Sequence, residues 1–199
     1  QFGIEALHPA KGALRQGVIV DLHHRLQALR KARHGDLRDA SVAELQRRFE
    51  VDAMQAERVS ALALALHEQA CPDADADSRR ELGWACELHE VGQMVSHHDH
   101  HRHSAYLVAH VDAAGFSQSQ QRRISELVLG QRGGLRKLDP ALALPQFAWQ
   151  ALCLRLAVIK CHARGAIDAR ALQLKCDNDK ALLAFSPTWA DNNPRTLHL

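Results

Sequence analysis

The segment LeuHisGluValGly at residues 88–92 decides the predicted fold, because it closes an amphipathic helix directly before a stretch rich in histidine. We expect that helix to run over residues 79–91, with Gly92 as a left-handed C-terminal cap. The stretch SerHisHisAspHisHisArgHisSer at 96–104 follows it. These residues predict a polar loop that opens another helix, in which apolar residues recur as far as Val111.

Two helices are expected upstream of this segment. SerValAlaGlu at 41–44 has the spacing of a capping box, which predicts a helix start at Ser41. A second helix is expected from about Asp52 up to the break at 71–78. Its apolar residues recur at helical spacing and therefore share one face: Val59, Leu62, Ala63 and Leu66.

Downstream, the residues predict two more helices and a hairpin. A turn and cap at 114–121 precede a helix marked by Ile124, Leu127 and Val128, and a Gly-rich basic loop follows at 130–140. A last long helix should end near Gly165. On it, one face is expected to carry Leu152, Leu156 and Ile159. Alternating apolar residues at 172–176 and 183–185 flank AspAsnAsp, which predicts a β-hairpin.

Composition sets limits on the class of protein. The chain has 199 residues, 46% of them hydrophobic and 24% charged, which is typical of a globular domain. A net charge of +2 gives no overall attraction for nucleic acid or a membrane surface, and no apolar run approaches the length of a membrane span. Five cysteines without a CxxC pair indicate reduced thiols and a cytoplasmic location. Fourteen histidines stand out, because they titrate near neutral pH.

The order of helices around residues 88–92 resembles the HD superfamily of helical, metal-dependent phosphohydrolases. In that superfamily the metal is held by an early His, a His-Asp pair and a late Asp. The matching positions here are Gln55, His89 with Glu90, and Val158. An amide is a weak ligand and Val is none, so this comparison predicts a dismantled metal site. The predicted fold class is mainly α, an HD-domain-like helical bundle with a small C-terminal β-hairpin appendage.

A closer resemblance covers nearly the whole chain. Five segments occur in the order typical of the C-terminal half of the exopolyphosphatase / guanosine pentaphosphate phosphohydrolase (Ppx/GppA) family. They are ArgGlnGlyValIleValAspLeu (15–22), ArgPheGluValAspAlaMetGlnAlaGluArgVal (48–59), LeuHisGluValGly (88–92), HisHisArgHisSerAlaTyr (100–106) and GlyPheSerGlnSerGlnGln (115–121). This resemblance implies three parts: a remnant of a preceding actin-like domain or linker at 1–25, an HD-like helical domain at 26–165, and a partial β-containing terminal domain at 166–199.

The same resemblance implies a division of labour. Hydrolysis in the family belongs to an N-terminal pair of actin-like domains, and the parent enzyme is expected to use Mg²⁺. This chain should then need no cofactor and should be inactive alone. Its expected role is to hold inorganic polyphosphate or guanosine pentaphosphate, to contact its own N-terminal domains and to form a homodimer. No catalytic residue and no metal ligand are assigned to it.

Basic residues in two loops are the candidate phosphate ligands. Histidines before a helix start, where backbone N–H groups and the helix dipole favour anions, can join fixed charges in the Gly-rich loop. Many modest contacts of this kind sum to salt-sensitive binding of a polyanion, which should strengthen as the pH falls toward 6. Replacing His101, His103 and Arg132 together should weaken binding. The full candidate set is His97, His101, Arg102, His103, Arg132, Arg136 and Lys137.

Two other functions fit the residues and stay open at this point. The first is an independent HD-type phosphohydrolase with a divalent ion at His89 and Glu90. The second is a helical interaction domain with a vestigial anion site. The histidine run can also be a solvated loop without a specific function. His97 and His101 could form a metal-binding pair if both lie on one helix.

Overall fold

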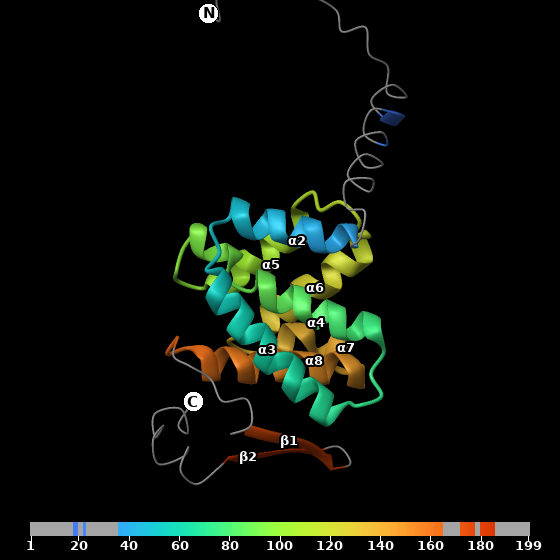
Figure 1. The fold of residues 1–199 in the computed structure, drawn as a ribbon, viewed down its shortest axis with the longest axis vertical. Coiled ribbons are helices and arrows are strands. Elements are labelled where there is room, and N and C mark those ends of the chain that lie inside the picture. The colour runs from blue at the N-terminus through green and yellow to red at the C-terminus, as the bar shows by residue number, and fades with distance from the viewer. Residues whose placement is uncertain (1–17, 20–21, 23–35, 165–171, 178–179, 186–199) are drawn as a thin grey trace, which may run out of the picture.

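The computed structural model describes residues 18–19, 22, 36–164, 172–177 and 180–185 of the chain. The predicted fold class is confirmed at the level of secondary structure, since the described residues are mainly helical and end in an antiparallel hairpin (Figure 1). The elements are α2 (Leu37–Arg48), α3 (Ala53–Ala70), α4 (Ala76–Leu88), the 3-10 helix η1 (Val91–Met94), α5 (His100–His110), α6 (Gln118–Gly130), the 3-10 helix η2 (Arg136–Leu138), α7 (Asp139–Leu142), α8 (Pro145–Cys161), β1 (Leu172–Asp177) and β2 (Lys180–Phe185).

The start of α2 differs from the prediction. The helix begins at Leu37, and its cap is Asp36, whose carboxylate accepts a hydrogen bond from the backbone N–H of Arg38. Ser41 lies inside the helix, where its hydroxyl donates to the carbonyl of Ala114 at 2.7 Å. An Asp in extended conformation just before the first turn is a strong N-cap. The Ser41 hydroxyl is therefore free to join α2 to a loop that is distant in the sequence.

Two other predicted helix starts are confirmed. Asp52 caps α3 by accepting from the backbone N–H of Gln55. Ser117 caps α6 in a capping box with Gln120. In both cases the side-chain oxygen satisfies a backbone donor that the first turn leaves without a partner. The predicted apolar face of α3 is also confirmed, because all its members are buried: Val59, Leu62, Ala63 and Leu66.

The predicted role of Gly92 is wrong. α4 begins at Ala76 behind the cap Asp75 and ends at Leu88, so Gly92 lies within η1 rather than at a helix end. Positive-φ glycines among the described residues are Gly115 and Gly133. A Cβ at Gly92 would lie 2.2 Å from the backbone nitrogen of Ser104. Glycine is needed there because η1 and the start of α5 approach each other at backbone distance.

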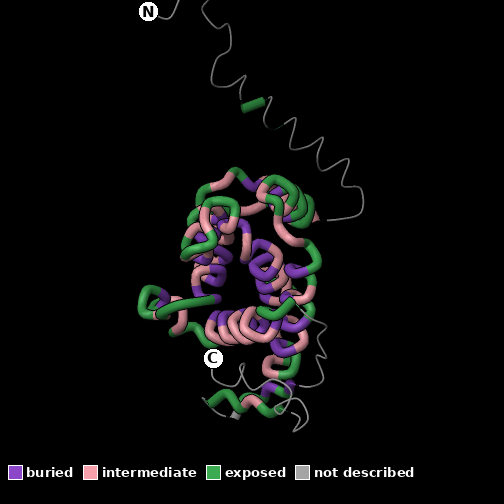
Figure 2. The backbone as a smooth tube through the Cα atoms, turned by 90° about the vertical axis from the view of Figure 1, so that its left-hand side faces the viewer, coloured by how far each residue is buried: buried purple, intermediate pink, exposed green. Residues whose placement is uncertain are grey.

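The core lies between α3, α4, α6 and α8, with buried positions along their inner sides (Figure 2). Trp84 is 4% exposed and packs edge-on against Phe116, with ring centroids 4.9 Å apart. Trp149 is partly buried, and Trp189 lies outside the described residues. On α8 the fully packed side differs from the face expected from spacing. It carries Phe147, Ala151, Leu154 and Ala157, whereas Leu152, Leu156 and Ile159 are half-buried.

The hairpin packs on the helical domain through β1. Leu172 and Leu174 are buried, and the backbone N–H of Leu174 donates to the Gln69 side chain at 2.9 Å. Leu174 pairs with Leu183 across the antiparallel ladder. Figure 1 places the two strands beside the C-terminal part of α3. The predicted strands are therefore confirmed, while the turn residues 178–179 lie outside the described part.

Several sequence expectations concern residues that the structure does not describe. These include most of the segment 1–25 and, from the segment 166–199, all residues outside the two strands. All five cysteines lie in the described part, and Cys86, Cys153 and Cys161 are buried. Among the described residues, none of the helices has the length and apolarity that crossing a membrane requires.

Candidate functional site

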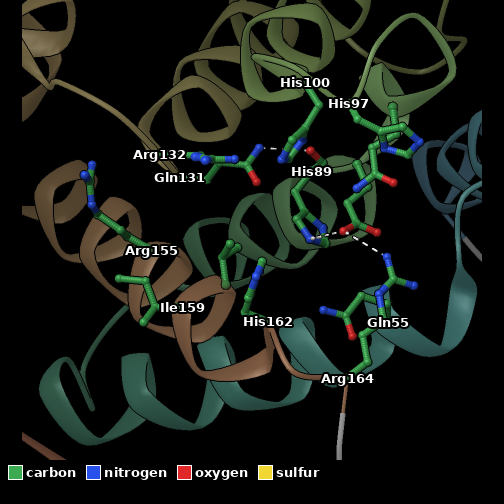
Figure 3. A pocket seen from close by; sticks show the side chains of 13 residues that line it. Gln55, His89, His97, His100, Gln131, Arg132, Arg155, Ile159, His162 and Arg164 are labelled. Carbon is green, nitrogen blue, oxygen red and sulfur yellow. Dashed lines mark hydrogen bonds and ion pairs between the residues drawn. The ribbon is translucent and has the colours of Figure 1, made fainter. Parts of the chain in front are cut away.

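A cavity of about 480 Å³ opens where α3 begins and where α4, α6 and α8 end (Figure 3). Its lining carries more positive than negative charge, because three arginines face one glutamate, Glu90, and four histidines also line it. A cleft lined by one sign of charge focuses the electric field and concentrates ions of the opposite sign. The basic side chains are Arg132, Arg155 and Arg164 together with His89, His97, His100 and His162.

All four positions that match the metal ligands of HD proteins line this cavity. Gln55 comes from the first turn of α3, His89 and Glu90 follow α4, and Val158 is on α8. The fold thus brings residues about one hundred positions apart into one site. Within the described ranges, the structure holds no group of three or more His, Cys, Asp or Glu residues suited to a metal ion.

His89 forms part of the inner wall and is 1% exposed. Its Nδ1 lies 2.6 Å from the carbonyl oxygen of Cys86, and its Nε2 lies 3.8 Å from Oε1 of Glu90. Burial lowers the pKa of His89 to about 4, so the ring is neutral near pH 7. Because a carbonyl accepts the bond from Nδ1, that nitrogen carries the proton, and Nε2 has the free lone pair.

The other matching positions are engaged with protein groups. The amide of Gln55 donates to the Cys161 carbonyl at 2.9 Å and accepts from the Arg58 guanidinium. Glu90 lies 3.6 Å from a nitrogen of Arg164. Arg164 also forms an ion pair with Asp52, the cap of α3. These contacts join the ends of α3 and α8 at the mouth of the cavity.

The structure brings two of the seven predicted phosphate ligands to this cavity, His97 and Arg132, and both are exposed. Of the other five, His101 is 5% exposed and lies beneath the Gly-rich loop, next to Gly133. Burial lowers the pKa of His101, so it carries less charge at pH 6 than an exposed histidine. The remaining four lie on the surface outside the cavity lining: Arg102, His103, Arg136 and Lys137.

The histidine run is divided by the start of α5. His97 precedes the helix, which begins at His100, so His97 and His101 do not share one helix. Arg102 forms an ion pair with Asp99 at 3.4 Å, and His98 is almost fully exposed. His100, which the sequence assigns to a solvated loop, is half-buried and lines the cavity. The run therefore supplies both site residues and surface residues.

Sequence reasoning missed Arg155, His162, Arg164 and Gln131. Arg155 extends from α8 to the Gly-rich loop and donates to the carbonyls of Gly130, at 3.1 Å, and Gly133, at 2.8 Å. It thereby fixes the backbone next to Arg132. The residues gave no local signal for this contact, because Arg155 lies in the middle of an amphipathic helix. The one feature of the sequence that could have indicated a further cation at the site was a basic residue just after the last helix, such as Arg164.

A family model described as "Ppx/GppA phosphatase, domain III" matches residues 37–198. The chain belongs to the Ppx/GppA phosphatase family. Its Ppx/GppA relatives include proteins named guanosine-5'-triphosphate,3'-diphosphate pyrophosphatase. The one from Vibrio vulnificus is 32% identical over 97% of this chain, and the one from Photobacterium profundum is 31% identical over 97%. The chain spans 39% and 38% of their lengths, respectively. The family predicted from the five motifs is therefore confirmed.

Proposed function

We propose that this chain is the C-terminal phosphate-chain-binding and dimerisation region of a Ppx/GppA phosphatase, with hydrolysis performed by actin-like domains of the same protein outside this chain. Its ligand is inorganic polyphosphate or guanosine pentaphosphate. The names of the relatives support a guanosine nucleotide, since both describe an enzyme that acts on guanosine-5'-triphosphate,3'-diphosphate. Mg²⁺ would serve the hydrolytic domains.

The observation that carries this proposal is the charge of the cavity. Three guanidinium groups face it, and one carboxylate, Glu90, opposes them. Arg132 makes no hydrogen bond or ion pair with the other described residues, and it is exposed next to the loop that Arg155 holds. An unpaired guanidinium is suited to phosphate, because it can donate two parallel hydrogen bonds.

The donor set does not fit a divalent ion. Val158 has no ligand atom, Gln55 already uses its amide within the protein, and Glu90 faces Arg164. A metal at this position would find His89 and Glu90 as neighbours and several cations around them, which opposes its charge. We infer that an ancestral metal position has been converted into an anion site, and no step of the proposed function passes through a metal here.

A binding experiment tests the proposal. We expect the 199-residue chain to bind polyphosphate with an affinity that falls steeply with salt, because each contact releases counterions. Arg132→Gln should raise the Kd by about tenfold and reduce the dependence of log K on log salt by about one. Arg122→Gln is the matched control, because it removes the same charge from an exposed position at the far end of α6.

The alternatives predict different results. An independent HD phosphohydrolase would contain a stoichiometric metal that His89→Ala removes, and the chain alone would hydrolyse its substrate. If the chain is an interaction domain with a vestigial anion site, the Arg132→Gln and Arg122→Gln variants should both bind polyphosphate weakly and with equal affinity. Analytical ultracentrifugation of the same sample measures the mass of the chain in solution and so tests dimerisation. A monomeric mass at every concentration used would contradict dimerisation and would leave the binding result unaffected.

A further inference from the structure

The inner wall of the cavity contains a hydrogen-bond acceptor that the protein does not use. We propose, building on the proposed function, that the cavity selects a phosphorylated ligand that also carries a hydrogen-bonding group of its own, as a nucleoside triphosphate does and an inorganic polyphosphate does not. The residues that make this selection are Gln131 and His100, which both line the cavity (Figure 3).

The orientation of the Gln131 amide is fixed by the protein. Its Nε2 donates to the carbonyl oxygens of His89 and Val128, each at 2.9 Å. An amide nitrogen has two N–H groups, so both are used. A flipped amide would place its oxygen against two carbonyl oxygens, which excludes that orientation. Oε1 is therefore presented as an acceptor, and Figure 3 shows it directed into the cavity.

Oε1 of Gln131 has no hydrogen-bond partner, although the residue is 1% exposed. A buried acceptor without a partner costs about 1–3 kcal/mol, and such atoms are rare in native proteins. The cost falls when a bound group donates to this oxygen. A ligand with a donor thus gains an interaction here that a ligand without one cannot make.

His100 adds a second unused atom to the same wall. Its Nδ1 is buried without a partner, and burial lowers the pKa of its ring, which favours the neutral form. A neutral imidazole offers one N–H and one lone pair. A hydroxyl both donates and accepts, so it can meet the requirement of either atom. A guanine base carries both N–H and carbonyl groups on its edge and can do the same.

Inorganic polyphosphate has little of this chemistry at pH 8, because its interior phosphates are deprotonated and their oxygens can only accept. Such an oxygen placed against Oε1 of Gln131 would be repelled. Arg132 follows Gln131 in the sequence and faces the cavity, so a phosphate on Arg132 lies next to the unused acceptor. A volume of about 480 Å³ falls within the usual range for small-molecule sites, which leaves room for a sugar and base.

The experiment compares ligands with the same phosphate groups. The Kd values of the 199-residue chain are measured for GTP, 2',3'-dideoxy-GTP and inorganic tripolyphosphate at pH 8. We expect GTP to bind about three- to tenfold more tightly than tripolyphosphate, the range that one or two neutral hydrogen bonds provide. Dideoxy-GTP shows which part of GTP forms the hydrogen bonds. Weak binding of dideoxy-GTP would assign them to the sugar hydroxyls, and tight binding would assign them to the base.

The variant Gln131→Met should abolish this preference and leave tripolyphosphate binding close to that of the unaltered chain. Gln150→Met is the matched control, since Gln150 is fully buried and also donates to a backbone carbonyl, that of Ser78, outside the cavity. Loss of packing alone would lower the melting temperature of both variants and leave the preference in each. If Gln131→Met does not fold, His100→Phe removes the second atom and should reduce the same ratio.

The two proposals fail in different ways. Equal affinity for GTP and tripolyphosphate, or a preference that persists in Gln131→Met and in His100→Phe, would overturn the selection and mean that water alone meets Oε1. Salt-sensitive binding of both ligands in that case would still support the anion site. Failure of every ligand to bind would instead remove the proposed function and this inference together.

Discussion

His89 has a ring enclosed between the end of α4 and the cavity, with Nδ1 donating to the Cys86 carbonyl. A histidine followed by an acidic residue suggests a metal ligand or a cation when met in the sequence. Burial changes that meaning, because it lowers the pKa of His89 to about 4 and keeps the ring neutral. The positive charge of the site therefore comes from the arginines, not from this residue.

Protonation of His89 should destabilise the fold in acid. A histidine has a pKa of about 6.5 in the unfolded chain and about 4 here, so the unfolded state binds the proton first as the pH falls. The free energy of unfolding should fall by about 3 kcal/mol between pH 7 and pH 4 from this group alone. In His89→Asn the pH-dependent loss should be smaller by about that amount, as measured by chemical denaturation at both pH values.

An identical loss of stability in His89→Asn and the unaltered chain would show that His89 does not titrate in this interval. Asn can preserve the donor to Cys86, so the comparison changes titration more than packing. His100 and His101 also contribute little to the expected strengthening of ligand binding toward pH 6, because burial lowers the pKa of each.

At the scale of elements, the contact between η1 and α5 forms the upper wall of the cavity. The backbone N–H of Gly92 donates to the Ser104 hydroxyl at 2.8 Å, and that hydroxyl donates to the carbonyl of His89 at 2.9 Å. Gln131 donates to the same carbonyl from the end of α6. The backbone after α4 is thus held by two other helices, which sets the position of His89 and Glu90.

Gly92→Ala should be severely destabilising. The new Cβ would lie 2.2 Å from the Ser104 nitrogen and 2.4 Å from the His100 carbonyl oxygen, and neither backbone atom can move independently. We expect a loss of about 3 kcal/mol or more in the free energy of unfolding, measured by urea denaturation.

The matched control is Gly83→Ala within α4, where a Cβ would meet no atom within 4 Å. Alanine has less conformational freedom than glycine in the unfolded chain and should stabilise this helix by about 0.5–1 kcal/mol. A Gly92→Ala protein as stable as the unaltered chain would mean that η1 and α5 can separate without cost, and the wall of the cavity would not be rigid.

At the scale of the whole molecule, the hairpin is attached to the helical domain at a position remote in sequence from the cavity residues of α4–α6. β1 lies against α3, which also begins at the cavity with Gln55. α3 therefore runs from the cavity to the hairpin (Figure 1). Packing of the hairpin should stabilise α3 and, through it, the site.

Leu174→Ala should test this packing. Leu174 is 1% exposed, and removal of its buried methyl groups should cost about 2–4 kcal/mol in the free energy of unfolding. Leu182→Ala on β2 is the control, because Leu182 is 53% exposed and should change stability by less than about 0.5 kcal/mol. Both are measured by thermal and urea denaturation. Equal effects of the two variants would show that the hairpin does not contribute to the folded core.

The sequence by itself determined the family, the helical class, the hairpin and the regions where α3 and α6 begin. Those features depend on neighbours along the chain, namely the 3.6-residue period, the two-residue period and the reach of a short side chain to the next turn. The predicted helix start at Ser41 was wrong because Asp36 already caps the helix, and Ser41 instead contacts Ala114. The predicted helix end at Gly92 was wrong because the close approach of Ser104 decides the role of that glycine.

Tertiary structure alone decided which cations form one site. Arg132 and His97 were found from local charge, whereas Arg155 and Gln131 reach the cavity through contacts between helices distant in the sequence. Burial, likewise, separated the neutral His89 from the exposed His97 although both are histidines near one loop. Charge and unpaired hydrogen-bonding atoms depend on what surrounds a side chain in space, and the order of residues along the chain does not specify those surroundings.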